Sequence, residues 1–263
     1  MEPLFLIRVP VAMGKLAYCA GERGWLIQRG HDVEFDEGRA LHHLVSEAFG
    51  PGVFRPFRLL VPPGGMVGSL YGYCRSNAET LRRSGRMYAF PEHLGVLDIE
   101  QLVGKPMPAS WTEGQRIGFD LRVRPVRRLN DNLGHGPFRK GTEVDAFLVE
   151  ALRRFSDNPG GMAGSGHTRE SVYLDWLAER LTPVAELDRQ ATRLARFQRA
   201  RVLRGSGSTE GPDATLHGVL RVRNPERFST LLVRGVGRHR AYGYGMLLLR
   251  PVSRQRQRRE HVL

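Results

Sequence analysis

A glycine-rich segment near the end of the sequence has the residue types of an anion-binding loop. Residues 235–245 read GVGRHRAYGYG, and the glycines are Gly235, Gly237, Gly243 and Gly245. Glycine tolerates turns that point successive N–H groups at one anion, and Arg238 and Arg240 would add charged donors for phosphate oxygens. Tyr242 and Tyr244 could stack on bases or pack inside the protein. The segment therefore predicts a phosphate- or RNA-binding loop.

Two other interpretations of this segment exist. A dinucleotide-binding GxGxxG loop needs a preceding strand and a following helix, whereas here a predicted helix precedes the loop and the chain ends soon after it. A turn between a helix and a strand that binds no ligand uses glycine in the same way. The segment alone does not separate this turn from a binding loop.

A pair of histidines, His42 and His43, on the first predicted helix is the second candidate for chemistry. Leu41 and Leu44 face the predicted core, so His42 lies at the edge of the apolar stripe, one turn after Arg39. A neutral imidazole exchanges a proton readily near neutral pH, and RNA carries its own nucleophile in the ribose 2′-OH. One histidine can therefore support strand scission, although a half-buried histidine without a catalytic role fits the same pattern.

Arginine is dense in three parts of the chain. The basic residues there are Arg122, Arg124, Arg127 and Arg128, then Arg139 and Lys140, and then Arg189, Arg193, Arg196, Arg199, Arg201 and Arg204. All of the last group except Arg204, which follows directly, lie in residues 183–203, whose apolar spacing predicts a helix with one basic side. Such a side could lie along a phosphate backbone or in the groove of an A-form duplex, or it could be an ordinary solvated face.

Other catalytic chemistries have little support. The nine histidines lack the spacing of zinc ligands, no serine or cysteine lies in a recognisable nucleophile motif, and no carboxylate cluster suggests a metal-dependent nuclease. Cys19 and Cys74 form neither a metal motif nor a disulfide framework, which is typical of a protein in a reducing cytosol. We therefore expect no metal and no cofactor.

The composition favours a polyanionic partner. The 263 residues carry a net charge of +13, and only Lys15, Lys105 and Lys140 of the 40 basic residues are lysines. Arginine presents a planar fork that matches phosphate and guanine edges, although a GC-rich genome also encodes arginine in place of lysine. Nucleic acid is a better candidate partner than an acidic membrane surface. No leader or membrane span is recognisable, so we expect a cytoplasmic protein.

The first half of the chain is predicted to alternate strands and helices. Asp36 can cap a helix that Gly50 and Pro51 end. The other predicted elements are a strand at 3–12, a hairpin at 24–35, strands at 54–61 and 67–73, a short helix at 77–84 and a strand at 117–126. Apart from the hairpin, the order is β-α-β-β-α-β.

The second half is predicted to follow a linker that contains Asn130 to Gly136. A T-x-x-D capping box of Thr142 and Asp145 begins a helix with a clear apolar stripe. The remaining predictions are a loop at 157–168, helices at 170–181 and 183–203, a loop at 205–213, a strand at 215–223, a helix at 225–234, a strand at 245–252 and a basic tail. Both halves are compatible with the same split βαβ unit.

Four segments together resemble the CRISPR RNA-processing endoribonucleases of the CasE type, in the repeat-associated RAMP superfamily. The most specific is HGVLRVRNPERFSTLLVRGVGRHRAYGYGMLLLRP at 217–251, which resembles the C-terminal glycine-rich signature of that family. The others are similar in the same order: LHHLVSEAF at 41–49 with RPFRLL at 55–60, RVRPVRR at 122–128, and RKGTEVDAFL at 139–148. The resemblance touches most of the chain.

This resemblance implies an α+β protein with tandem ferredoxin-like βαββαβ domains. The first would span residues 1–129 and carry the catalytic helix, residues 130–141 would be the linker, and the second would span 142–263 and carry the glycine-rich loop. A CRISPR repeat RNA hairpin would lie across both domains. The processed crRNA would stay bound, and the protein would join other subunits of a surveillance complex. No long heptad pattern is present, so we expect a monomer in isolation.

The resemblance also implies a metal-independent cut, in which the ribose 2′-OH attacks the phosphate and leaves a 2′,3′-cyclic phosphate and a 5′-OH. His42 matches the catalytic histidine and would act as general acid or base. Many relatives carry a tyrosine one helical turn earlier, where this chain has Arg39, which could stabilise charge on the phosphorane. The residues expected to bind RNA are Arg122, Arg124, Arg139, Lys140, Arg193, Arg196, Gly235, Gly237, Arg238, His239, Arg240, Gly243, Tyr244 and Gly245.

Two further functions fit the same features. A non-catalytic RNA-binding subunit of such a complex would keep the loop and the arginines but would not need His42. A generic basic RNA-binding protein would bind with similar salt dependence but without preference for a repeat hairpin. Only an activity assay separates the nuclease from the non-catalytic subunit.

Overall fold

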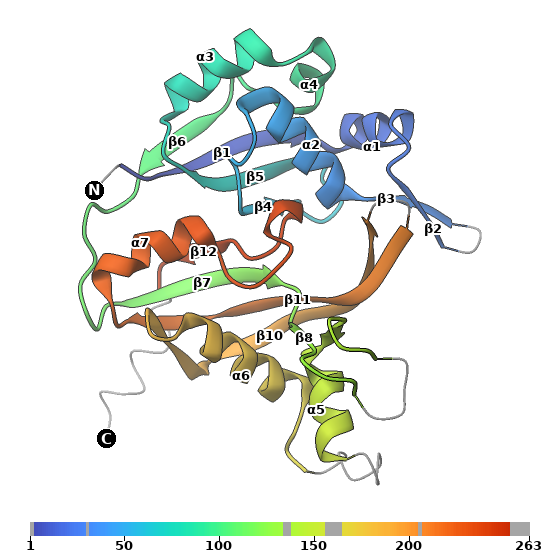
Figure 1. Cartoon of the computed structure of the whole chain (residues 1–263). Coiled ribbons are helices and arrows are strands. Elements are labelled where there is room, and N and C mark those ends of the chain that lie inside the picture. The colour runs from blue at the N-terminus through green and yellow to red at the C-terminus, as the bar shows by residue number, and fades with distance from the viewer. Residues whose placement is uncertain (1–2, 30–31, 134–137, 156–164, 205–206, 253–263) are drawn as a thin grey trace.

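Two antiparallel four-stranded sheets form the centre of the protein (Figure 1). The computed structural model describes residues 3–29, 32–133, 138–155, 165–204 and 207–252. One sheet is completed along the chain before the other begins, so the fold divides into a first and a second unit. The first unit lies above the second in Figure 1.

The first unit has the β-α-β-β-α-β order of a ferredoxin-like fold. This pattern is formed by β1 (Phe5–Ala12), α2 (Glu37–Phe49), β4 (Phe57–Leu60), β5 (Val67–Cys74), α3 (Ala78–Tyr88) and β6 (Val103–Pro106). The strand order in the sheet is β4-β5-β1-β6. The additional elements are α1 (Met13–Glu22), the hairpin of β2 (Leu26–Arg29) and β3 (Asp32–Phe35), and α4 (Pro91–Val96).

The second unit repeats this topology. Its pattern is formed by β7 (Arg116–Val123), α6 (Arg169–Leu181), β10 (Ala185–Arg204), β11 (Gly207–Val222), α7 (Pro225–Arg234) and β12 (Leu247–Arg250). The sheet order β10-β11-β7-β12 corresponds strand for strand to that of the first unit. The additional elements are β8 (Val126–Arg128), β9 (Glu143–Asp145), α5 (Ala146–Arg154) and the 3-10 turn η2 (Arg240–Tyr242). The predicted α+β class with tandem ferredoxin-like folds is confirmed.

Most of the predicted elements are present. The confirmed ones are the strands at 3–12, 54–61, 67–73, 215–223 and 245–252, the hairpin at 24–35, and the helices after Asp36 and at 77–84, 170–181 and 225–234. Asp36 caps α2 as expected, since its side chain accepts a hydrogen bond from the N–H of Arg39. Parts of the predicted linker and of the loop at 157–168, and the basic tail from residue 253, lie outside the described residues.

The strand predicted at 117–126 is present as β7, but its predicted place in the first half is wrong. It pairs with β11 and β12 in the second sheet, and β6 is the fourth strand of the first sheet. All of β6 is exposed, and its sequence VGKP contains glycine and proline, so no alternating pattern marks it as a strand. The chain passes from one sheet to the other between Pro106 and Arg116, and the predicted boundary at residue 129 does not separate the sheets.

The stretch at 183–203 is a strand, so the predicted basic helix is wrong. It forms β10, which pairs with β11 out to Arg204 and Gly207, and the predicted loop at 205–213 is therefore largely strand. Alanine, leucine, arginine and glutamine favour helices locally, but cross-strand pairing along the whole hairpin outweighs these weak preferences. A register shift between Asp188 and Arg193 also interrupts the alternation typical of a strand.

Two helices differ from their predictions. The helix expected from Thr142 begins at Ala146, because residues 143–145 pair with β8. Asp145 caps it instead, by accepting a hydrogen bond from the N–H of Phe147 at 2.9 Å. The helix α1, which the sequence pattern does not predict, begins without a side-chain cap and buries few residues, so its apolar stripe is too short to recognise.

The two units share part of their apolar interior. One core lies between the first sheet and its helices and includes Ile7 and Leu44. The other joins the second sheet to α6 and α7, and it also includes Leu4 and Tyr73 from the first unit. The hydroxyl of Tyr73 donates a hydrogen bond to the carbonyl of Leu247 on β12 at 2.9 Å. The units therefore pack as one body with a continuous interface.

A buried carboxylate also joins the units. Asp120 on β7 is 2% exposed and accepts a hydrogen bond from the guanidinium of Arg58 on β4 at 3.2 Å. His217 on β11 and Arg250 on β12 contact the same carboxylate at 2.9 and 2.8 Å. Because Arg58 belongs to the first sheet and Asp120 to the second, this network fixes one sheet against the other.

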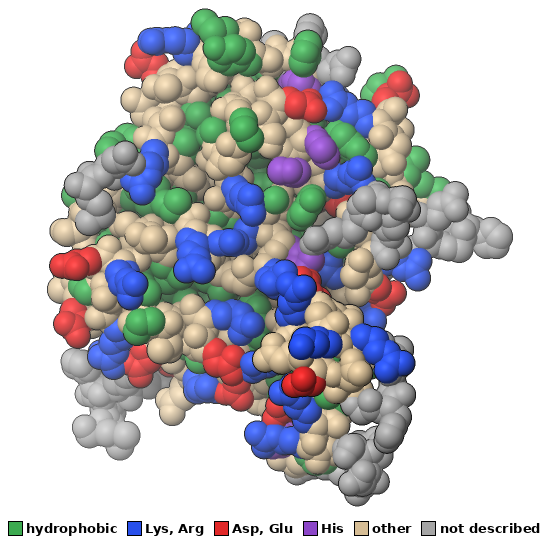
Figure 2. All heavy atoms as spheres, viewed as in Figure 1, with side chains coloured by type: hydrophobic (Ala, Val, Ile, Leu, Met, Phe, Trp, Pro, Cys, Tyr) green, Lys and Arg blue, Asp and Glu red, His purple; other side chains and the backbone are tan. Residues whose placement is uncertain are grey.

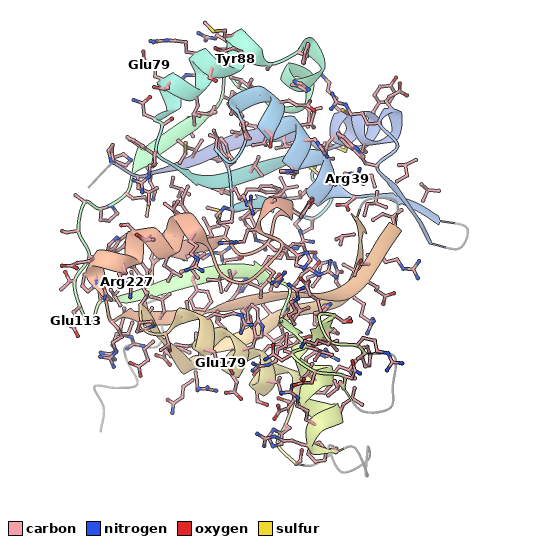
Figure 3. The ribbon with its side chains drawn as sticks, viewed as in Figure 1. Arg39, Glu79, Tyr88, Glu113, Glu179 and Arg227 are labelled. Atoms are coloured by element: carbon pink, nitrogen blue, oxygen red, sulfur yellow. The ribbon has the colours of Figure 1, made fainter. Side chains whose placement is uncertain are left out.

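Asp120→Ala removes the acceptor that these three side chains share. Breaking a buried pair from one side leaves an uncompensated charge, so we expect the free energy of unfolding to fall by about 3–5 kcal/mol. Glu113→Ala, at an exposed position before β7 (Figure 3), is the control and should change it by less than about 0.5 kcal/mol. Urea denaturation measures both values, and equal stability of the two variants would contradict this role of Asp120.

Candidate functional site

The helix α2 carries His42 at the junction of the two units. Its cap, Asp36, is buried and uses both carboxylate oxygens: one accepts from the N–H of Arg39 at 2.9 Å and the other from the N–H of Leu203 on β10 at 2.7 Å. The start of the helix is therefore held by the second unit. Leu41 is buried on the core side, which leaves half-buried His42 and Arg39 on the outer side of α2; Figure 3 shows Arg39 there.

Aromatic rings border His42. The ring of Tyr242 in η2 meets the imidazole edge to face, with ring centroids 5.3 Å apart and an interplanar angle of 62°. His43 lies at a centroid distance of 5.3 Å and stacks in turn on Trp25 at 4.8 Å. His42 thus has ring contacts from both units, whereas Trp25, on which His43 stacks, belongs to the first unit.

Its surroundings favour the neutral form of His42. Burial lowers the pKa of His42 first, and the positive charges of His43 and Arg55 lower it further. The pKa of His43 is lowered by burial and then by Arg39, while Glu47 opposes this shift. At neutral pH the His42 imidazole therefore has a free lone pair and can accept a proton.

Arg55, which lies near His42, also lies near arginines of the second unit. Arg39 lies one turn earlier on α2, and Arg55 lies just before β4. The pKa of Arg240 is lowered by burial and then by Arg55 and Arg234, which places these three cations close together, and Arg240 donates to the carbonyl of Arg234 at 2.5 Å. Figure 2 shows histidine side chains beside Lys and Arg side chains on this face. A proton acceptor surrounded by cations suits chemistry on a phosphate.

Arg55 and Arg234 are site residues that the sequence analysis does not identify. Arg55 begins the RPFRLL segment, and Arg234 ends α7 directly before the glycine-rich loop. Neither position lies in a distinctive motif. Arg55 and Arg234 are far apart in the sequence and come close together only when the glycine-rich loop packs on the first unit.

The glycine-rich loop packs against protein on several sides. Gly235, Gly237, Gly243 and Gly245 all have positive φ values, between 71° and 83°. A Cβ on Gly235 would lie 2.7 Å from Pro56 Cγ, and one on Gly243 would lie 3.1 Å from Phe57 Cε2. Both neighbours belong to the first unit. Gly235 and Gly243 thus allow close packing between the units, and the predicted contact of the four glycines with RNA stays a prediction.

Two of the predicted RNA contacts in this loop are engaged with one carboxylate. His239 contacts Glu143 through Nε2 at 2.7 Å, and Arg238 contacts it through Nε at 2.5 Å. Burial alone would raise the pKa of Glu143, but these partners lower it below its ordinary value. The side chain of His239 is buried, whereas that of Arg238 is half-exposed and can still face a ligand.

Three other predicted RNA contacts are engaged with neighbouring side chains. Arg124 and Tyr244 are buried, whereas Arg122 is half-buried. Arg122 makes two hydrogen bonds to Asp213 at 2.9 and 2.8 Å, and the guanidinium of Arg124 lies 5.8 Å from the centre of the Tyr244 ring. Burial alone would raise the pKa of Asp213, but this pairing lowers it. The guanidinium of Arg122 also lies 4.7 Å from the centre of the Tyr244 ring. These contacts give all three side chains a structural role.

The remaining predicted RNA contacts are exposed. Arg139 and Lys140 lie before β9, and Arg193 and Arg196 lie on β10. Arg196 borders a cavity of about 340 Å³ between α2, η2 and β10, which Tyr242 also lines. Arg193 borders a second cavity, of about 300 Å³, together with His217 and other residues. The structure thus brings Arg196 next to the start of α2.

Within the described ranges, no group of three or more His, Cys, Asp or Glu side chains could hold a metal ion. No helix in the part of the chain that the structure describes is long and apolar enough to cross a membrane.

The pKa of His42 can be measured directly. In an NMR titration of the histidine Cε1–H signals, His42 should titrate below its ordinary value of 6.5, and Arg55→Ala should raise its pKa because a nearby positive charge is removed. Arg227→Ala, at an exposed site on α7 (Figure 3), should leave it unchanged. A pKa of His42 at or above 6.5 in the unmodified protein would contradict the lowering by burial and by the neighbouring positive charges.

Solved structures of similar fold include two complexes with RNA. The CRISPR endoribonuclease Cse3 bound to a 19-nucleotide RNA has a TM-score of 0.61 and 17% identity, over 95% of this chain and 100% of that one. Cse3 of Thermus thermophilus, bound to an RNA representing a pre-cleavage complex, has a TM-score of 0.61 and 18% identity over the same shares. Cas6e from Escherichia coli K-12 has a TM-score of 0.56 and 15% identity, over 94% of this chain and 100% of that one. At these identities the likeness shows the shared fold.

The sequence itself identifies the family. No curated protein is significantly similar to the chain in sequence. The family model described as "CRISPR associated protein" matches residues 5–251, which is nearly the whole chain. This match confirms the resemblance drawn from the glycine-rich signature. The chain belongs to the CRISPR-associated protein family.

Proposed function

We propose that this chain is a metal-independent endoribonuclease that binds the hairpin of a CRISPR repeat RNA and cuts precursor crRNA beside α2. The observation that carries the proposal is His42, a half-buried imidazole with a lowered pKa beside Arg55, which in turn lies near Arg240 of the second unit. Membership of the CRISPR-associated family supports the substrate. The fold shared with RNA-bound endoribonucleases supports the reaction class.

The proposed reaction uses the nucleophile of the RNA. The 2′-OH on the 5′ side of the cut loses its proton and forms a bond to phosphorus. The bond from phosphorus to the 5′-oxygen of the next nucleotide breaks, and that oxygen gains a proton, which leaves a 2′,3′-cyclic phosphate and a 5′-OH. Neutral His42 accepts the first proton, and its protonated form can supply the second. One histidine therefore serves both transfers when its imidazole lies within hydrogen-bonding distance of both the 2′-oxygen and the 5′-oxygen.

Arginines would stabilise the phosphorane. Arginine keeps its charge at every physiological pH, so Arg39 and Arg55 would stabilise negative charge and would not exchange protons. They lie on different elements, α2 and the segment before β4, and so approach the region of His42 from different directions. In the proposed mechanism His42 transfers the protons, and the arginines stabilise the negative charge.

The exposed cations on β10 would hold the RNA backbone. Arg193 and Arg196 lie on the long β10–β11 hairpin, and Arg196 borders the cavity beside α2. A phosphate backbone along this strand would lead toward His42. After cleavage the processed crRNA would stay bound, and the protein, a monomer in isolation, would join other subunits of a surveillance complex.

The nuclease is tested by incubating the protein with its host's repeat RNA in EDTA. We expect one cut, with a 2′,3′-cyclic phosphate at the new end, and we expect His42→Ala to bind the RNA but to lower the cleavage rate by at least about 100-fold, the lower range for a lost general acid-base. His167→Ala, remote from α2, is the histidine control and should cut normally.

The alternative outcome has a distinct pattern. Tight binding of the repeat without any cut by the unmodified protein would reject the nuclease and favour a non-catalytic RNA-binding subunit. Cleavage that needs a divalent ion would reject the proposed mechanism. Equal binding of the repeat hairpin and of unrelated RNA would indicate a generic RNA-binding protein.

The contact of β10 with RNA is tested by salt dependence. Each lost phosphate contact should reduce the slope of log affinity against log salt concentration by about 1. We therefore expect Arg196→Ala to weaken RNA binding and to lower this slope, while Arg227→Ala on α7 changes neither. An unchanged slope for Arg196→Ala, measured by filter binding between low and high salt, would remove Arg196 from the RNA interface.

A further inference from the structure

Tyr242 lies in the glycine-rich loop between two residues with left-handed backbone conformations. It ends the short 3-10 turn η2, which begins after His239 in a left-handed conformation (φ 62°) and ends before Gly243, also left-handed (φ 81°). The left-handed conformation is costly for a residue other than glycine, so the loop at His239 is held by its surroundings. The contacts of His239 and Arg238 with Glu143 help to stabilise this conformation.

The backbone of Tyr242 lies directly on α2. A Cβ at Gly38 would be 2.5 Å from the carbonyl oxygen of Tyr242, so the first turn of α2 accepts only glycine at this point without a shift. Gly38 is one helical turn before His42, on the same helix. The loop of the second unit is therefore fixed against the segment that carries the histidine.

The side chain of Tyr242 reaches the histidine. Its ring meets the imidazole of His42 edge to face, with centroids 5.3 Å apart. Tyr242 also lines the cavity that Arg196 borders. An imidazole bordered on one side by a fixed ring has fewer side-chain orientations available than one open to solvent.

We propose that Tyr242 is a positioning residue for His42: its ring, rather than its hydroxyl, holds the imidazole in the orientation from which it transfers protons. This assigns to the glycine-rich loop a role within the active site, in addition to any contact with RNA. The inference rests on the proposed nuclease, since it concerns the orientation of that enzyme's histidine.

Single-turnover cleavage of the repeat RNA separates positioning from binding. Misplacing a catalytic group by about 1 Å can cost roughly 100-fold in rate. We therefore expect Tyr242→Ala to lower the cleavage rate constant by about 10- to 100-fold, with little change in the Kd for RNA. Tyr242→Phe keeps the ring and should retain most of the rate.

Gly38→Ala tests the same contact from the helix. Alanine is the better helix former, so a loss of activity would come from displacement of Tyr242 and not from a weaker α2. We expect this variant to resemble Tyr242→Ala. Gly21→Ala on α1, where a Cβ has no neighbour within 4 Å, and Tyr88→Ala at an exposed site on α3 (Figure 3) are the controls and should cut normally.

A second measurement does not depend on RNA. Burial is the largest cause of the lowered pKa of His42, so Tyr242→Ala should raise that pKa toward its ordinary value and Tyr242→Phe should not. His43 and Arg55, the other groups that lower it, are unchanged in both variants. An NMR titration detects this difference, and circular dichroism confirms that each variant is folded.

The outcomes distinguish this inference from the proposed function. Failure of the unmodified protein to cut would reject the nuclease, whatever the variants do. If the unmodified protein cuts through His42 and Tyr242→Ala cuts equally well, the positioning role is rejected while the nuclease stands. If Tyr242→Phe loses as much activity as Tyr242→Ala, the hydroxyl is the required group and the proposed role of the ring is wrong.

Discussion

The start of α2 is held by the second unit at two points, and the candidate site depends on both. Asp36 accepts a hydrogen bond from the N–H of Leu203 on β10, and Gly38 packs on the carbonyl of Tyr242. These contacts place His42, which belongs to the first unit, beside Tyr242 of the second. Neither ferredoxin-like unit contains this arrangement alone, so docking of the units builds the site.

The charges of the protein fall into two sets with different tasks. Inside, the pair of Arg58 and Asp120 connects the two sheets, and the pair of Arg122 and Asp213 joins β7 to β11 within the second sheet. Outside, Arg196 and other arginines on β10 stay accessible, although several have acidic neighbours. A pair of one arginine and one carboxylate has no net charge, so such internal pairs leave the net charge of +13 to the rest of the protein.

The sequence predicts the repeated βαββαβ pattern where local signals are strong. Asp36 before an apolar stripe predicts α2, and Asn224 before Pro225 suits the start of α7. Prediction fails for β10, whose helix-forming residues are held extended by pairing with β11, and for β6, which has no buried residue. His42 is recognisable from its motif. The contacts of Arg55 and Tyr242 are not, because they arise only when distant segments pack together.

We expect the scissile phosphate to lie against His42 at the junction of the units. The most direct measurement is a structure of the protein bound to a repeat RNA whose nucleotide before the cut carries a 2′-deoxy ribose, which prevents the reaction. In that structure we expect the scissile phosphate to lie among His42, Arg39 and Arg55. The imidazole should lie about 2.6–3.2 Å from a reacting oxygen or be linked to it by one water. An ordered RNA whose scissile phosphate lies away from α2 would contradict it.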